Sequence, residues 1–567
     1  MDSESLPWWK KTVVYQIYPR SYMDSTGNGI GDLKGIISKL DYIKDLGVET
    51  IWFSPFFKSP TDKPYKEHDC GYDISDYRDI NPEYGTMDDV DELIKGIHSR
   101  GMKIVLDMVM NHTSIEHPWF QKSRSSKDNP RRDWYIWRDG KKPNGKKPPN
   151  NWRPMIFLGG AWKYDESTEQ WYYHCFLPFQ PDLNYRNPEV QKEMLDTVRF
   201  WLKKGADGFR LDIFNALFED AEFRDAPFTF TIANGDMDLL FKSSKMTLNH
   251  PDTLEFCKKL RKTLDEYPGK FMVGEVGASL ATLKKYLGEV VEDGTNTNGL
   301  NVIFDLRSTS TPMKAKKFKK LIESYERWFP EPFFPTWVFG NHDQVRRISK
   351  IDNDIEQAKL NAALQLTARG MPYIYYGEEI GMRNAKIHKS ESKDAVSHHF
   401  KIIPQFIRNF ITRFGVSLNR DECRTPMQWN SAENAGFSPP GAETWLSVNN
   451  TSEENNVEVE EKDPESLLNC YKRFLKVRKE TTALNSGSIN FIEIKKSPKS
   501  LLAYERKAIV NNKEDKAFVF LNFSRKNIRF HNPLKNPKVL VSTSIKTEPL
   551  DNAQIVLMPW EGIVLIE

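Results

Sequence analysis

Cysteine is scarce in this chain, and its few cysteines do not form a disulfide pattern. Five cysteines occur in 567 residues, at the scattered positions 70, 175, 257, 423 and 470. Secreted domains that depend on disulfides carry an even number of cysteines at close spacings. The sequence therefore excludes a disulfide framework, and we expect a reducing compartment.

The chain also lacks an apolar run that could enter a membrane. No stretch of about 18 apolar residues occurs, and the opening Met-Asp-Ser-Glu-Ser has neither the basic nor the apolar region of a signal peptide. We predict a cytoplasmic protein without a membrane span, or a secreted one if a leader has been removed.

An excess of either charge is missing as well. The chain has 81 basic and 78 acidic residues and a net charge of +3, which does not favour a nucleic-acid partner. The lysine-rich runs at 141–147 and 314–320 are interpreted as solvated faces.

What the chain does have is four short apolar runs that each end in a carboxyl group. These acids are Asp107 in Asp-Met-Val-Met-Asn-His, Asp212 in Gly-Phe-Arg-Leu-Asp, Glu275 in Val-Gly-Glu-Val and Asp343 in Gly-Asn-His-Asp-Gln. In a β/α barrel the carboxyl ends of the strands form the face that carries the chemistry. The sequence therefore predicts an acidic catalytic site.

Eight strand candidates alternate with amphipathic helical stretches, which predicts a (β/α)8 TIM barrel. The strands are expected at 13–19, 49–55, 103–109, 208–212, 270–276, 302–306, 336–343 and 371–379, and the main helices at 33–46, 87–100, 188–204, 252–267 and 354–369.

The long connections predict the domain organisation. Residues 1–112 and 182–482 are assigned to the barrel, with an excursion at 381–424 after the eighth strand. The Trp-, Pro- and Lys-rich segment 113–181 is too long for a simple loop and is assigned to an inserted domain. Short alternating runs after a helix at about 465–480 predict a C-terminal antiparallel β-sandwich over 483–567.

These motifs resemble the α-amylase family of glycoside hydrolases, in its oligo-1,6-glucosidase and α-glucosidase branch. The resemblance extends from Val-Tyr-Gln-Ile-Tyr-Pro-Arg-Ser at 14–21 to the C-terminal strands, and it includes Gln-Pro-Asp-Leu-Asn at 180–184 and Arg-Thr-Pro-Met-Gln-Trp at 424–429. The motifs stand in the order in which the family has them, so the ordered set is far more specific than any one motif.

The resemblance implies a retaining double-displacement reaction. Such a reaction needs a carboxylate nucleophile and a carboxylic acid about 5 Å apart. Asp212 matches the nucleophile, Glu275 the acid and base, and Asp343 the third acid, which holds ring hydroxyls. Arg210 lies two residues before Asp212 on the same side of the strand and is expected to keep Asp212 ionised. For Asp107 two roles are open, a direct function or, as the resemblance implies and as we expect, an organising role through a bond to Arg210.

The same resemblance implies a set of substrate-binding residues. His112 and His342 match histidines that bond the glucose, and Tyr72 and Phe176 match aromatic walls around it. Asp69 and Arg424 match the pair that closes the far side of the subsite in exo-acting enzymes. This pair predicts a pocket for a terminal glucose instead of an open cleft. The substrate-binding residues are Asp69, Tyr72, His112, Phe176, Arg210, His342 and Arg424.

An N-terminal loop places oxygen-bearing residues at alternate positions, as a calcium loop does. These residues are Asp24, Thr26, Asn28, Ile30 and Asp32. The similar loop in the family binds Ca²⁺, so we expect a structural Ca²⁺ site. Thr26 and Asn28 leave it two carboxylates, so a weak site or Mg²⁺ is the alternative. No organic cofactor is expected.

The exact substrate is left open by the sequence. Ile213, after the nucleophile, is an aliphatic residue comparable to the Val of α-1,6-active relatives, which slightly favours isomaltose or sucrose over maltose. A sucrose isomerase or α-glucosyl transferase would use the same glycosyl-enzyme, although the Arg-Leu-Asp-Arg type of loop found in sucrose isomerases is not evident. Transporter heavy chains share this fold as binding partners, but they need a membrane span. The oligomeric state, monomer or dimer, is open.

Overall fold

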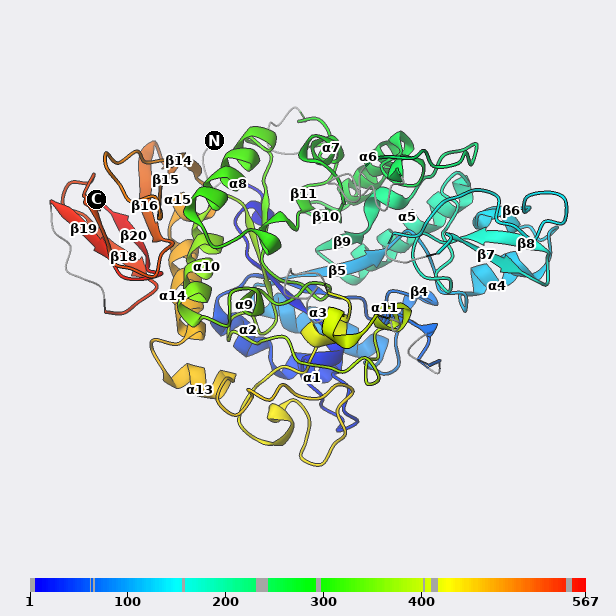
Figure 1. Ribbon diagram of the computed structural model, residues 1–567, viewed down its shortest axis with the longest axis horizontal. Coiled ribbons are helices and arrows are strands. Elements are labelled where there is room, and N and C mark those ends of the chain that lie inside the picture. Colours follow the sequence, from blue (N-terminus) through cyan, green and yellow to red (C-terminus); the bar gives the residue numbers. More distant parts are fainter. Residues whose placement is uncertain are drawn as a thin grey trace.

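The structure of the protein is a computed structural model that describes residues 6–61, 63–64, 67–155, 159–230, 243–291, 297–400, 403–408, 417–546 and 553–567. A parallel barrel occupies the middle of the molecule, between a small sheet from the first third of the chain and a larger sheet at the C-terminal end (Figure 1).

The central sheet has eight strands in the order β11-β10-β9-β5-β2-β1-β13-β12, and all seven pairings are parallel. They are β1 (Val14–Ile17), β2 (Thr50–Phe53), β5 (Lys103–Val109), β9 (Gly208–Asp212), β10 (Phe271–Glu275), β11 (Val302–Phe304), β12 (Thr336–Val338) and β13 (Met371–Tyr375). Each lies within or coincides with a predicted strand, so the predicted barrel is confirmed.

The barrel closes between β11 and β12 through a side chain instead of a strand ladder. The Thr336 hydroxyl donates to the Ile303 carbonyl at 2.8 Å and accepts from the Asp305 amide at 3.0 Å. A threonine that replaces ladder bonds satisfies backbone groups that would otherwise be buried without partners. The sheet is therefore a nearly closed barrel.

Helices follow the strands and cover the outside of the barrel. They are α1 (Leu33–Ser38), α2 (Leu40–Leu46), α3 (Met87–Ser99), α5 (Pro188–Lys204), α6 (Pro251–Asp265), α7 (Leu280–Tyr286), α8 (Ala315–Trp328), α9 (Arg347–Lys350) and α10 (Ile355–Thr367). The predicted helix 33–46 is two helices, because the backbone leaves the helical region at Lys39.

Local signals in the sequence explain where these helices begin and end. Helix α5 starts with Pro188 after Asn187, whose side chain caps the helix, and it ends at Gly205 with a left-handed φ of 115°. Thr86 and Asp89 form a capping box at the start of α3. Both helices therefore have the bounds that the sequence predicts, within one residue.

The segment between β5 and β9 folds against the carboxyl end of the barrel. It contains α4 (Pro118–Ser125) and a three-stranded antiparallel sheet in the order β6 (Trp137–Arg138), β8 (Gln170–Tyr173) and β7 (Trp162–Asp165). A separate short hairpin pairs β3 (Phe57–Lys58) with β4 (Asp76–Ile80). The excursion after β13 holds α11 (Ala395–His399).

The C-terminal part consists of two antiparallel sheets. One has the order β14-β15-β16-β20-β18 and the other pairs β17 with β19. Their bounds are β14 (Ser488–Phe491), β15 (Leu501–Val510), β16 (Lys513–Asn522), β17 (Ile528–His531), β18 (Lys538–Ser542), β19 (Gln554–Leu557) and β20 (Gly562–Ile566). Phe518, Phe530 and Leu557 belong to the apolar core of these strands, as the predicted sandwich requires.

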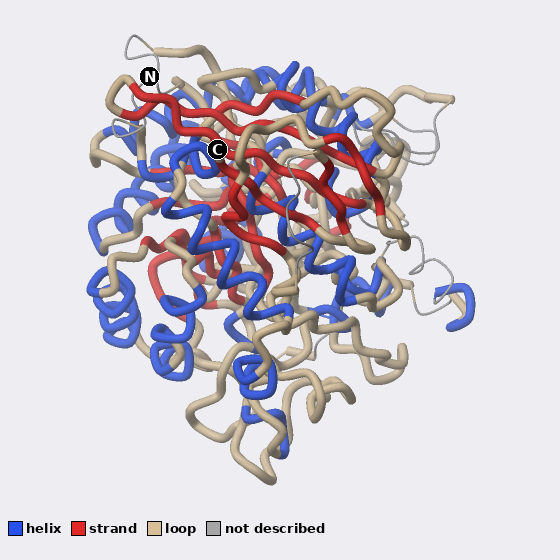
Figure 2. The backbone as a smooth tube through the Cα atoms, turned by 90° about the vertical axis from the view of Figure 1, so that its left-hand side faces the viewer, coloured by secondary structure: helices blue, strands red, loops and turns tan. Residues whose placement is uncertain are grey.

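Helices join this sandwich to the barrel, as the view from the C-terminal side shows (Figure 2). Helix α14 (Leu467–Glu480) packs on α10, and α13 (Val457–Lys462) and α15 (Thr482–Ser486) flank it. Arg478 and Arg506 are buried and donate to carbonyls of residues 366–370 and 484–487. Within the described ranges, none of the helices combines the length and the apolar character that crossing a membrane requires.

Candidate active site

One buried arginine gathers three of the predicted acids at the carboxyl ends of β5, β9 and β10. Arg210 Nη1 lies 2.9 Å from Asp107 Oδ1 and 2.7 Å from Asp212 Oδ1, and its Nη2 donates to Glu275. The Arg210 side chain is 0% exposed. The expected contacts of Arg210 with Asp212 and with Asp107 are therefore present, and the organising role of Asp107 stays a prediction.

The single positive charge of Arg210 cannot neutralise all three carboxyl groups that contact it. Burial raises the pKa of Asp212 and of Glu275 to about 7 each, and Arg210 opposes this rise in both. Burial likewise raises the pKa of Asp107 to about 6. The expectation that Arg210 keeps Asp212 ionised is therefore wrong for the free site, because one guanidinium serves three carboxyl groups and burial outweighs it. Near neutral pH the cluster holds a proton that its members share.

The segment between Asp212 and the following turn has a strained backbone. Ile213 has φ 32° and ψ 51°, a left-handed conformation that β-branched residues avoid. Its N–H is directed to the Glu275 carboxylate and opposes the rise in that group's pKa. Asn215 donates to the Gly277 carbonyl at 3.2 Å, which joins the ends of β9 and β10 a second time.

Asp343 lies among cations that keep it ionised. Arg424 Nη2 is 2.8 Å and Arg420 Nη1 3.3 Å from Asp343 Oδ1, and His342 Nε2 is 3.0 Å from Oδ2. Burial alone would raise the pKa of Asp343, but His342, Arg420 and Arg424 together hold it well below the usual value. Asp343 is therefore a carboxylate at every pH at which the protein would work.

Asp69 and Arg424, which are predicted to close the far side of the subsite, form no ion pair with each other among the described residues, and their shared role stays a prediction. Arg420 Nη2 instead lies 2.6 Å from Asp69 Oδ1, and the same nitrogen is 2.7 Å from Asp394 Oδ1. Arg424 is held elsewhere, because its Nε donates to the His342 carbonyl at 2.7 Å and its Nη2 to Asp343. Two arginines lie four residues apart in Asn-Arg-Asp-Glu-Cys-Arg, and only the second was chosen from the sequence.

The two predicted histidines are neutral and fully engaged. Burial lowers the pKa of His112 and of His342 to about 4. His112 Nε2 is 3.0 Å from the Tyr72 carbonyl, and its Nδ1 is 3.3 Å from the Asn111 amide. A sugar hydroxyl would have to share these nitrogens with the protein.

The predicted aromatic walls lie next to these histidines. The Tyr72 ring stacks on His342 with centroids 5.3 Å apart, so only its other face can meet a sugar. Phe176 is half-buried, 5.7 Å from the His112 ring. Cys70 is buried, which raises its pKa to about 11, so its thiol is not reactive.

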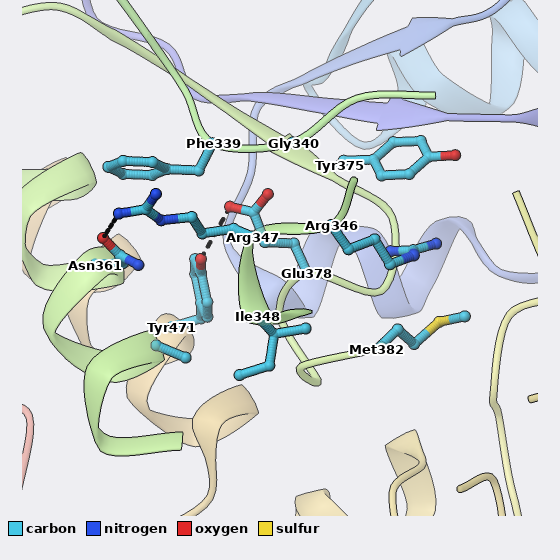
Figure 3. Close-up of a pocket in the computed structure, with 11 residues that line it drawn as sticks. Phe339, Gly340, Arg346, Arg347, Ile348, Asn361, Tyr375, Glu378, Met382 and Tyr471 are labelled. Carbon is cyan, nitrogen blue, oxygen red and sulfur yellow. Dashed lines mark hydrogen bonds between the residues drawn. The ribbon is translucent and has the colours of Figure 1, made fainter. Parts of the chain in front are cut away.

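A cavity lined by residues on both sides of segment 341–343 in the chain is separate from the predicted site. Gly340, Arg347 and Glu378 are among its lining residues, and Tyr471 donates to the Glu378 carboxylate at 3.1 Å (Figure 3). Burial raises the pKa of Glu378 to about 8. None of the predicted site residues lines this cavity, so it is not the substrate pocket.

The predicted calcium loop uses its carboxylates as acceptors for its own donors. Asp24 accepts the N–H groups of Thr26, Gly27 and Gly29 at 2.8–2.9 Å and also the Thr26 and Ser438 hydroxyls. Burial would raise the Asp24 pKa, but these bonds lower it.

The remaining members of the loop are used in the same way. Asp32 accepts from Ser25 and caps α1 through the Gly35 N–H at 2.7 Å, and Asn28 accepts the Ile30 N–H. A carboxylate offers about four lone-pair sites, and those of Asp24 are filled. The residues as they lie do not fit a cation, which would have to displace these donors. The predicted structural Ca²⁺ site is untested, and the loop as it lies favours the weak site that the sequence left open as the alternative.

The chain is similar to known proteins over nearly its whole length. Residues 16–487 match the model of the alpha-amylase catalytic domain, so the chain belongs to the α-amylase catalytic-domain family. The chain is 38% identical to an oligo-1,6-glucosidase of Parageobacillus thermoglucosidasius over 98% of both chains. It is also 38% identical to a probable alpha-glucosidase of Rhizobium meliloti (strain 1021), over 98% of this chain and 96% of that protein.

Among solved structures, the chain is similar to the alpha-glucosyl transfer enzyme XgtA, with a TM-score of 0.86 and 35% identity over 99% of both chains. The predicted family and the predicted barrel with a C-terminal sheet domain are thereby confirmed.

Proposed function

We propose that the protein is an exo-acting retaining α-glucosidase that releases glucose from the non-reducing end of short α-glucosides of the isomaltose, maltose or sucrose type. The observation that carries this proposal is the bridge made by Arg210, whose two terminal nitrogens contact Asp212 and Glu275. Two carboxyl groups on one guanidinium are close enough for a nucleophile and an acid, which retaining glycosidases hold about 5 Å apart.

The reaction proceeds in two displacements. Asp212 attacks the anomeric carbon while Glu275 gives its proton to the leaving oxygen, which yields a covalent glycosyl-enzyme. Glu275 then takes a proton from water, which attacks the same carbon and releases α-glucose. The mechanism requires the shared proton of the acid cluster to reside on Glu275 in the free enzyme. The N–H of Ile213 and Arg210 hold Glu275 in place for this role.

The ionised Asp343 binds ring hydroxyls of the glucose, and Arg420 closes the subsite beyond it. Arg420 links Asp343 to Asp69, and both its guanidinium and Asp69 are buried. A buried ion pair across the end of a subsite leaves no path for a further sugar. The enzyme therefore acts on terminal glucose and not within a chain.

The linkage is proposed from the relatives and from Ile213. Relatives named oligo-1,6-glucosidase support isomaltose as the first substrate, and the aliphatic Ile213 next to the nucleophile is consistent with it. The similarity to an alpha-glucosyl transfer enzyme supports transfer to a sugar hydroxyl as the second candidate activity. The five unpaired cysteines, all buried, support a reducing, cytoplasmic location.

Product analysis tests the proposal. The protein and its Asp212→Asn variant are incubated separately with maltose, isomaltose and sucrose, and the products are followed by NMR and chromatography. Release of α-glucose that the variant does not produce supports the retaining α-glucosidase and ranks the linkages. New disaccharides would show that the enzyme catalyses transfer or isomerisation instead of hydrolysis. β-Glucose as the first product would refute retention.

A further inference from the structure

Gln16 is a buried residue of β1 whose side-chain amide contacts His342 of the predicted site. Its side chain is 1% exposed, and its Nε2 lies 2.8 Å from His342 Nδ1 and 3.0 Å from Ser54 Oγ. An amide nitrogen has two hydrogens, and these two contacts use both. Gln16 Oε1 has no hydrogen-bond partner among the described residues.

This orientation of the amide fixes the proton on His342. In the present orientation one carbonyl oxygen lacks a donor. If the amide were rotated by 180°, its two buried N–H groups would lack acceptors instead, which costs more free energy. With Gln16 Nε2 as the donor, His342 Nδ1 is the acceptor. A neutral imidazole has only one N–H, so the proton of His342 is on Nε2.

His342 Nε2 points at the groups that the proposed reaction uses. It lies 2.5 Å from the Tyr72 hydroxyl oxygen and 3.0 Å from Asp343 Oδ2. The Tyr72 hydroxyl donates to Asp107 Oδ2 at 3.2 Å, so its oxygen is free to accept from His342. The donors therefore run in one direction, from Gln16 through His342 and Tyr72 to Asp107, the carboxylate that holds Arg210.

We propose that Gln16 is a positioning residue that keeps His342 in its Nε2–H form, so that the single Nε2 hydrogen, shared between Asp343 Oδ2 and the Tyr72 oxygen, holds both groups in their working orientation. The inference rests on the proposed function, because it gives Asp343 the role of a substrate-binding carboxylate. Gln16 itself does not contact a reacting atom.

The Gln16→Glu variant tests this inference through the pH profile. The charged and titratable groups facing His342 are Asp343, Arg210 and Arg424, with Tyr18, Tyr72 and Cys423. All stay in place in the variant. A carboxylate at position 16 attracts a proton to His342 Nδ1 and raises the His342 pKa above its present value of about 4.

The sign of the pH effect follows from where the proton goes. Below the raised pKa, His342 is doubly protonated and still donates from Nε2. Above it, the remaining proton stays on Nδ1 beside the introduced carboxylate, and Nε2 can no longer donate. We expect kcat/KM of the variant to fall by about tenfold as the pH rises through that pKa, the effect of one lost hydrogen bond to a charged group. The wild-type profile lacks this histidine step, because its His342 is already neutral, and shows only the fall above about pH 7 that the raised pKa of Glu275 causes.

Two further variants separate positioning from packing. Gln16→Leu is expected to lower kcat by about three- to tenfold at every pH, because His342 then populates both neutral forms. Gln365→Leu removes an equally buried amide on helix α10, which donates to the Tyr373 carbonyl at 2.8 Å and does not touch His342. It should lower the melting temperature without changing kcat or the shape of the profile.

A readout without substrate keeps this inference distinct from the proposed function. In protein labelled with ¹³C-histidine, the ring carbon shifts of His342, assigned through a His342→Gln variant, report which nitrogen carries the proton. We expect the Nε2–H form in the wild type and the Nδ1–H form at high pH in Gln16→Glu. An Nδ1–H wild type, or a Gln16→Glu profile of unchanged shape, would overturn the inference. A failure to hydrolyse any glucoside, with the expected shifts, would refute only the proposed function.

Discussion

Arg420, which the sequence alone did not single out, is predicted to be the energetic partner of Asp69. A double-mutant cycle measures this coupling. Asp69→Asn is combined with Arg420→Met in one cycle and with Arg424→Met in a second, and kcat/KM for the best disaccharide is measured for every variant. Methionine keeps much of the length of the side chain and removes the guanidinium.

The magnitude follows from the burial of the pair. Asp69 is 8% and Arg420 9% exposed, and their atoms are 2.6 Å apart, so solvent screens the interaction little. Close, buried charge pairs show coupling energies of about 1.5–3 kcal/mol, which corresponds to about ten- to 100-fold in kcat/KM. Arg424 makes its contacts with Asp343 and the His342 carbonyl, so its coupling to Asp69 should be below about 0.5 kcal/mol.

Folding must be checked before the cycle is interpreted. Arg420 also neutralises Asp394, which is 1% exposed, so Arg420→Met leaves a buried carboxylate unpaired and is expected to destabilise the protein by about 3–5 kcal/mol. Kinetics are therefore measured well below the melting temperature of each variant. Strong coupling of Asp69 to Arg424, with none to Arg420, would refute the assignment.

Three further predictions concern the acid and the metal. Glu275→Gln is expected to lower kcat/KM, which reports the first displacement, about 10²–10⁴-fold on disaccharides and much less on p-nitrophenyl α-glucoside, whose leaving group needs no proton; equal losses of kcat/KM on both would remove Glu275 as the acid. Because the raised pKa of Glu275 is about 7, the wild-type kcat/KM should fall as the pH rises above about 7, and a profile flat to pH 9 would contradict this. Ca²⁺ added alone is expected to raise the melting temperature by less than about 1 °C, since the loop carboxylates are filled, and calorimetry showing tight binding would establish the site.

The barrel could be predicted because its strands carry their own signals. Strands β5 and β9 coincide with the predicted ranges, since each is a buried, mainly apolar run with an acid at or near its end. Lys39, which divides the predicted helix 33–46, could not be found in this way, because the apolar spacing continues through it. Closure by Thr336 depends on a side-chain contact that no periodicity records. The predicted domain bounds, by contrast, remain predictions.

The acids of the site could be predicted for the same reason, since Asp212 and Glu275 end their strands. Arg420 could not, because it lies in a short 3-10 helix (Arg420–Cys423) on the long excursion after β13, and its target is 351 residues earlier in the chain. Two arginines in one short motif cannot be distinguished until the backbone shows which of them faces Asp69. Gln16 was missed for a related reason: it appears in the sequence as an ordinary member of a buried strand.

The left-handed backbone of Ile213 predicts that glycine is at least as stabilising as alanine at this position, the reverse of the usual order. Glycine is normally about 0.5–1 kcal/mol less stabilising than alanine. At a left-handed residue an alanine instead pays about 1–2 kcal/mol for its Cβ, which glycine does not. Ile213→Ala and Ile213→Gly both lose the same buried side chain, 7% exposed, so that loss largely cancels when the two are compared.

Ile213→Gly is therefore expected to equal or exceed Ile213→Ala in stability, by up to about 1 kcal/mol, measured from the urea midpoints of the two variants. A Gly→Ala substitution in ordinary backbone serves as the contrast: at Gly160, which is not left-handed and where an added Cβ meets no atom within 4 Å, alanine should not lose stability. A clearly more stable Ile213→Ala would mean that the backbone after Asp212 is not left-handed. The Ile213 N–H would then not point at Glu275, and the proposed acid would lose one of the two groups that hold it.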